Sequence, residues 1–125
     1  MYGSAVRVFS FGAEEGRHIT QYGSDFTMSR LAHTSGIHVG CMRLEAGGTV
    51  GYHQARTHQI LAVVEGAGWT RGEGPERTPL AAGSAVYWQP GEWHETGTET
   101  GLLAIVIEGD VLEGEPEAIG PAPAR

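Results

Sequence analysis

Short apolar runs separated by turn-forming residues dominate this chain. Ala5–Phe9 and Gly36–Leu44 alternate apolar and polar positions, as half-buried strands do. The runs Ile60–Val64 and Leu102–Ile107 are continuously apolar and short, and both contain β-branched residues, which favours buried strands over helix. A further strand is expected to end at Trp88, just before a Gln-Pro-Gly turn.

The spacing of these runs predicts an all-β protein. The expected strands recur about every eight to twelve residues, and no segment shows a helical period, which is typical of a sandwich or barrel. A length of 125 residues fits one domain. We expect a single barrel domain over residues 1–112, in which strands within residues 1–35 serve packing or dimer contact. The Pro- and Gly-rich residues 113–125 are expected to run over the surface.

Composition narrows the possible partners. The chain has 8 basic and 15 acidic residues and a net charge of −7, which disfavours nucleic acid and anionic membrane surfaces. Cys41 is the single cysteine, so no internal disulfide forms, and its apolar surroundings predict a buried, inert thiol. No run is long enough to span a bilayer, and no signal peptide is evident at the N-terminus. We therefore expect a cytoplasmic protein.

Two histidines precede the apolar run that begins at Ile60. In one continuous strand, His53 and His58 would face opposite sides because they are an odd number of residues apart. His53 and Gln59 would share a face but lie about 20 Å apart at roughly 3.3 Å per residue. A site in this region therefore needs a reversal within QART, residues 54–57. After it, either His58 or Gln59 faces inward beside His53.

GYHQARTHQILAVVEG (residues 51–66), followed by GSAVYWQPGEWHETGT (residues 83–98), resembles the two motifs of the cupin family. The first family motif carries His-x-His, then Glu and Gly, and the second carries Pro-x-Gly-x-x-His and Asn. The resemblance covers about Ile37 to Glu108. It implies a small cupin of the conserved-barrel type, with two antiparallel sheets in jelly-roll topology. Family members often hold a divalent metal inside the barrel.

The resemblance assigns metal ligands residue by residue. His53 matches the first histidine and His94 matches the histidine of the second motif. Ala55 stands where the second histidine is expected, Gln59 where the glutamate is expected, and Thr98 where the asparagine is expected. The implied metal set is therefore His53, Gln59 and His94. This set lacks a negative charge, so a divalent Fe, Mn, Ni or Zn ion is expected to bind weakly, and a metal-free pocket is the alternative.

Other histidines flank this set. The resemblance puts His58 one residue before a ligand position, so it is expected on the outward face, exposed to solvent. His38 alternates with Leu44, and if Leu44 points into the barrel, His38 does too. There His38 would replace the missing ligand or act as a general base, or it is simply bonded to a carbonyl or water at a strand end. His18 and His33 lie beside turns and are expected at the surface.

Three functions are compatible with these residues. The first is a metal-assisted enzyme acting on a small molecule, of the oxygenase, isomerase, lyase or cyclase type. The second is a non-catalytic small-molecule-binding or sensor cupin with a degenerate, metal-free site. The third is a structural dimer, which two buried histidines argue against because buried polar groups need partners. In each case we expect a homodimer, because the early strands exceed what a minimal barrel needs.

Overall fold

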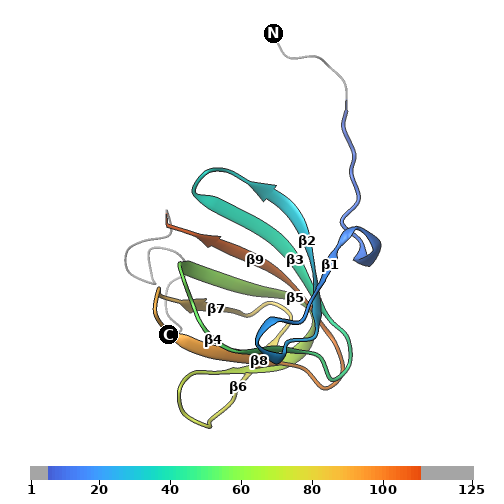
Figure 1. The fold of residues 1–125 in the computed structure, drawn as a ribbon. Coiled ribbons are helices and arrows are strands. Elements are labelled where there is room, and N and C mark those ends of the chain that lie inside the picture. The colour runs from blue at the N-terminus through green and yellow to red at the C-terminus, as the bar shows by residue number, and fades with distance from the viewer. Residues whose placement is uncertain (1–5, 111–125) are drawn as a thin grey trace.

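The computed structural model describes residues 6–110, which fold into strands that are all paired antiparallel (Figure 1). The strands are β1 (Arg17–Ile19), β2 (Phe26–His33), β3 (Ile37–Leu44), β4 (Thr49–Gln54), β5 (His58–Arg71), β6 (Thr78–Ala81), β7 (Ala85–Trp88), β8 (Trp93–Gly97) and β9 (Leu102–Gly109). Two single-turn 3-10 helices, η1 (Ala13–Glu15) and η2 (Gln21–Gly23), complete the described elements. Within residues 6–110, no helix has the length and apolar character needed to cross a bilayer.

The long strand β5 joins two layers of sheet. Its first half pairs with β9 and β7, in a layer that continues through β3 and β2 to β1. Its second half pairs with β6 and β8, and β8 pairs in turn with β4. The sheet therefore curls into a half-barrel, and the predicted all-β cupin jelly-roll is confirmed.

Alternation along the strands sorts side chains between the barrel interior and its outer face. On β3, Met42 and Leu44 are buried, and on β5, Leu61 and Val63 are only 2% exposed. These residues belong to one apolar core that spans both layers. Cys41 is completely buried, as expected, and burial raises the pKa of its thiol. The cysteine is therefore part of the packing and is held as the thiol form.

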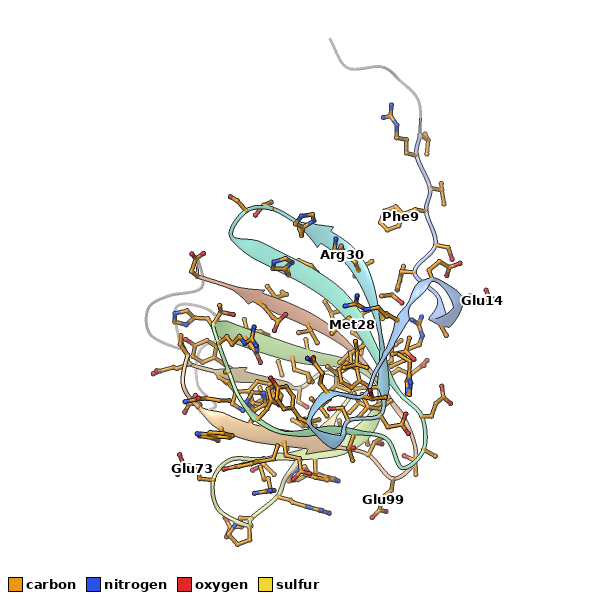
Figure 2. The ribbon with its side chains drawn as sticks, viewed as in Figure 1. Phe9, Glu14, Met28, Arg30, Glu73 and Glu99 are labelled. Atoms are coloured by element: carbon orange, nitrogen blue, oxygen red, sulfur yellow. The ribbon has the colours of Figure 1, made fainter. Side chains whose placement is uncertain are left out.

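The N-terminal segment departs from the sequence prediction. A strand was expected over Ala5–Phe9, but the described residues 6–9 pair with no strand, and Val6, Val8 and Phe9 are strongly exposed. Figure 2 shows Phe9 clear of the sheet. The prediction is wrong there because alternation makes a strand only where a neighbouring strand accepts its hydrogen bonds. Ala5 and the predicted surface tail over residues 113–125 lie outside the described residues.

Candidate functional site

A cavity of about 100 Å³ lies inside the barrel, which is room for a few water-sized groups. His53, Gln59 and His94, the three residues that the resemblance assigns to a metal, all line it. They come from β4, β5 and β8 respectively. The other lining residues are Phe26, Met28, Met42, Val50, Leu61, Trp88, Thr96, Val106 and Glu108. The structure therefore brings the three residues together inside a largely apolar wall.

A break in the regular pairing of β4 turns His53 inward. Val50 pairs with Thr96, and His53 pairs with His94, but the register shifts between these two pairs. Strict alternation would put Val50 and His53 on opposite faces, because they are three residues apart. Both nevertheless line the interior cavity. The irregularity re-aims a side chain at a site, as β-bulges commonly do.

Four aromatic rings form a row that contains both histidines. Tyr22 of η2 stacks on His53, with centroids 5.1 Å apart and planes 7° apart. His53 lies 4.4 Å from His94 at a tilt of 59°, and His94 stacks on Trp88 at 4.0 Å and 16°. The row leads from the half-exposed Tyr22 to the buried Trp88. Both imidazoles are thus fixed by ring contacts on two sides.

Backbone carbonyls select the same tautomer in both histidines. The Nδ1 of His53 lies 2.7 Å from the carbonyl oxygen of Gly51, and the Nδ1 of His94 lies 3.3 Å from that of Glu92. A carbonyl oxygen only accepts hydrogen bonds, so Nδ1 carries the proton in each ring. In the neutral rings, Nε2 then keeps its lone pair. Metal-binding histidines commonly show this arrangement, in which the other ring nitrogen donates to a carbonyl.

Burial keeps His94 neutral. Its side chain is only 2% exposed, and desolvation, helped by the nearby His53, lowers the pKa of His94 from 6.5 to about 4. The hydrogen bond to the Glu92 carbonyl opposes this shift but is the smallest contribution. At neutral pH the ring is therefore an unprotonated base, as a metal ligand or hydrogen-bond acceptor must be.

Glu108 supplies a carboxylate that the sequence analysis missed. It stands opposite Gln59 in the register of β9 and β5, and the Gln59 Nε2 donates a 2.8 Å hydrogen bond to the Glu108 Oε2. Glu108 is half-buried and lines the same cavity as His53 and His94. The signal was present in the sequence, because alternation from Leu102 puts residues 104, 106 and 108 on one face.

The segment QART breaks the strand, as the sequence required. β4 ends at Gln54, β5 begins at His58, and the buried Ala55 bonds to the backbone at Gly91 and Glu92. His58 does not line the interior cavity. Its expected exposure is only partly right, since it is half-buried, stacks on Tyr87 and shares a 2.6 Å hydrogen bond with the Tyr87 hydroxyl.

His38 lies at the rim and not in the cavity. It follows the inward-facing row of β3, but its side chain is exposed and stacks on His33, at 5.4 Å between centroids. Two outer pockets that His38 lines also include Glu108, which is its register partner on β9. The role of His38 as a general base therefore stays a prediction. Glu108 lines both the interior cavity and the two outer pockets at His38, so it lies between them. His33 is exposed, as expected.

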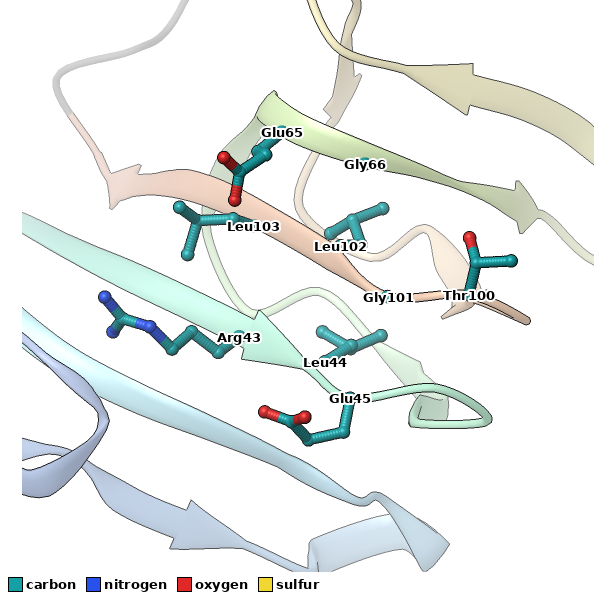
Figure 3. A pocket seen from close by; sticks show the side chains of 9 residues that line it. All are labelled: Arg43, Leu44, Glu45, Glu65, Gly66, Thr100, Gly101, Leu102 and Leu103. Atoms are coloured by element: carbon teal, nitrogen blue, oxygen red, sulfur yellow. The ribbon is translucent and has the colours of Figure 1, made fainter.

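Two further observations delimit the site. Within residues 6–110, no three or more His, Cys, Asp or Glu side chains are grouped closely enough to hold a metal ion by themselves. A groove of about 430 Å³ over the last residues of β3, the first residues of β9 and the middle of β5 is lined by Arg43, Glu45 and Glu65 (Figure 3). It contains no histidine, and Arg43 is bonded to the Phe11 carbonyl oxygen. The interior cavity therefore remains the candidate site.

Comparison with solved structures identifies the fold. A cupin 2 conserved barrel domain protein from Salinispora arenicola is 17% identical, with a TM-score of 0.69 over 86% of this chain and 91% of that chain. KdgF from a Halomonas species is 25% identical, with a TM-score of 0.66 over 80% and 93%. A predicted oxalate decarboxylase from Thermotoga maritima is 22% identical, with a TM-score of 0.66 over 81% and 99%. No model of a known protein family and no curated protein matches the sequence.

Proposed function

Because this chain has the cupin fold, we propose that it binds a small molecule inside its barrel and acts on it with a divalent metal held by His53 and His94. The observation that carries the proposal is the imidazole pair. The two rings face each other across β4 and β8 at 4.4 Å, and each Nδ1 is engaged by a carbonyl. One buried and one half-buried imidazole, His94 and His53, with the same tautomer at one cavity are the arrangement that an N-liganded ion needs.

The residues of the cavity fit a transition ion in type of donor. His53 and His94 would hold it through nitrogen, and Glu108 or Gln59 would complete the set with oxygen. Imidazole and carboxylate together suit Fe, Mn, Ni or Zn. An ion bound there supplies Lewis-acid polarisation of a ligand oxygen.

Glu108 brings a negative charge to the cavity that the set of His53, Gln59 and His94 lacks, although among residues 6–110 it is not grouped with both imidazoles closely enough to hold an ion with them alone. The resemblance expects a glutamate where Gln59 stands, and the neighbouring strand offers one directly opposite. Gln59 orients the Glu108 carboxylate by its hydrogen bond. A carboxylate at this boundary of the cavity also accepts protons from a bound substrate, which makes Glu108 our candidate general base beside the sequence-derived His38.

The largely apolar wall of the cavity favours a reaction that is shielded from bulk water. Core side chains from both layers surround the polar groups, and Trp88 covers one face of His94. Electrostatic interactions are stronger in such a setting than in bulk water. These features support an enzyme over a purely binding module.

Nickel titration of the purified protein tests the proposal. Trp88 stacks on His94, so a paramagnetic ion bound at His94 should quench tryptophan fluorescence. We expect saturable quenching in the wild type and a loss of about 100-fold or more in affinity for His53→Ala and His94→Ala, since each removes a ligand.

His58→Ala is the matched control, because His58 is a histidine of β5 outside the cavity lining. It should leave nickel affinity unchanged and cost about 1 kcal/mol of stability through the lost bond to Tyr87. Equal nickel affinity in the wild type and in all three variants would eliminate the metal site and favour the metal-free binding cupin.

A further inference from the structure

A second cavity lies beside the first, on the other side of His53. Its volume is about 500 Å³, and the rings of Tyr22, Tyr52 and Trp93 line it. Tyr52 and Trp93 stack on each other with centroids 5.2 Å apart. Gln54, Ala55, Arg56 and Gly91 complete the lining, together with His53. We refer to these eight residues as the outer cleft.

His53 is the shared wall between the outer cleft and the interior cavity. It is the one residue that lines both. Ala55 lines the cleft beside His53 with only a methyl group. A ligand in the outer cleft would therefore touch the same ring that faces His94 inside the barrel.

The backbone of Tyr22 is strained at the point where its ring stacks on His53. Tyr22 has φ 60° and ψ 27°, and it is the one non-glycine residue among residues 6–110 with a positive φ. A left-handed conformation at a bulky residue is strained and is typical of functional sites. Gly51 makes the close approach possible, since a Cβ there would lie 1.7 Å from the Tyr22 carbonyl oxygen.

The charge of the outer cleft is opposite to that of the chain. The protein has a net charge of −7, yet Arg56 is the cleft's charged side chain and no carboxylate lines it. Within the described residues, no salt bridge or hydrogen bond engages the Arg56 guanidinium. Arg71, in contrast, forms a salt bridge with Glu95, and its guanidinium lies over the Tyr52 ring. Arg56 is therefore available to an anionic ligand.

We propose that the outer cleft binds a carboxylate carried on a ring, with the ring against Trp93, which Tyr52 supports from behind, and the carboxylate at Arg56. Flat aromatic surfaces favour ring ligands through stacking and apolar contact, and a guanidinium favours carboxylates. The proposal names a substrate class for the site under the proposed function, because a ligand held there contacts His53. Binding in the outer cleft does not depend on the proposed function. Only the role of the bound ligand as a substrate at the interior cavity rests on it.

Benzoate is the probe, added to chelator-treated protein and followed by amide NMR shifts. It should shift signals of residues 52–56 and 91–93, whereas acetate, which lacks the ring, and benzamide, which lacks the charge, should bind more weakly. Arg56→Gln should weaken benzoate binding about 5-fold, the upper end for an exposed ion pair, and Trp93→Ala about 2- to 10-fold. The surface variant Arg17→Gln should bind as the wild type does.

Cyclohexanecarboxylate has a saturated ring in place of the flat ring of benzoate. Comparing the two affinities shows whether the cleft prefers a flat or a saturated ring. Three results overturn the proposal: no shifts in these segments, equal affinity for benzoate and benzamide, or equal weakening by Arg56→Gln and Arg17→Gln. The nickel titration is separate. Benzoate binding without nickel binding retains the cleft and rejects the metal, and the reverse result rejects the cleft alone.

Discussion

His53 and His94 stand directly opposite each other on β4 and β8, and each ring is tied through Nδ1 to the carbonyl two residues before it. The same local hydrogen bond therefore fixes the orientation of both imidazoles. Because the pair is cross-strand, its spacing depends on the register of two strands and on the irregularity that precedes His53.

The stability of the metal-free protein should depend on pH through His94. Its folded pKa of about 4 is lower than the ordinary 6.5, so the unfolded chain binds more protons between these pH values. The contribution is fully present above pH 6.5 and is lost as the pH falls to 4. The lost free energy of unfolding is on the order of 3 kcal/mol.

Urea unfolding at pH 7.5 and pH 4.5, with chelator present, measures this loss. His94→Asn should flatten the dependence, because asparagine does not titrate. An identical pH dependence in the wild type and His94→Asn would assign the effect to other groups.

Glu108→Gln should weaken metal binding by about 10- to 100-fold, whether the carboxylate binds the ion or orients a neighbour that does. The substitution keeps the shape of the side chain and removes its charge. Glu45→Gln, on the outer groove of Figure 3, is the matched control and should have no effect. Calorimetric zinc titration measures both variants, and equal affinities would remove Glu108 from the site.

Gly51→Ala should displace η2 from β4, because the new Cβ would overlap the Tyr22 carbonyl oxygen. We expect a loss of about 1–3 kcal/mol, typical of overpacking, and weaker benzoate binding in the outer cleft. Gly47→Ala separates backbone strain from this clash. Gly47 has a φ of 81° but no atom within 4 Å of its Cβ position, so it should lose stability without losing benzoate. Unchanged benzoate affinity in Gly51→Ala would show that η2 does not shape the cleft.

We also propose that the protein is a homodimer, as the sequence suggested. Val39, Ile107 and Ile60 form a row across the outer face of β3, β9 and β5, and each is only half-buried. Val8 and Phe9 of the N-terminal segment are strongly exposed. Sedimentation at micromolar concentration should give a dimer, and Ile107→Asp should give a monomer. A wild-type monomer under these conditions would contradict the proposal.

Local patterns in the sequence were sufficient for the fold and for much of the site. Alternation located the strand at Gly36–Leu44, and continuous apolar runs located those at Ile60–Val64 and Leu102–Ile107. The odd spacing of His53 and His58 required the break that occurs at residues 55–57. The motif match placed Gln59 and His94 on the cavity beside His53. Each inference used residues close in sequence or a fixed strand period.

Features set by distant pairing could not be predicted in the same way. The Gln59–Glu108 bond joins residues 49 apart, and the Tyr22 ring reaches His53 from a turn outside the motifs. Alternation from Leu102 put Glu108 on the inward face, but only the register of β9 against β5 places it opposite Gln59. The prediction of a strand at residues 5–9 was wrong for the same reason, because the pattern of one segment does not show which strand it pairs with.

Under the proposed function, His53 and His94 form the ligand pair, with Nδ1 protonated and Nε2 open to a metal. Long-range proton–nitrogen NMR of the imidazole rings, recorded before and after zinc addition, observes both nitrogens of each ring. We expect the Nδ1–H tautomer for both residues in the metal-free protein and a large Nε2 shift in both on adding zinc. The Nε2–H tautomer in either ring, or zinc shifts confined to His18, His33, His38 or His58, would contradict it.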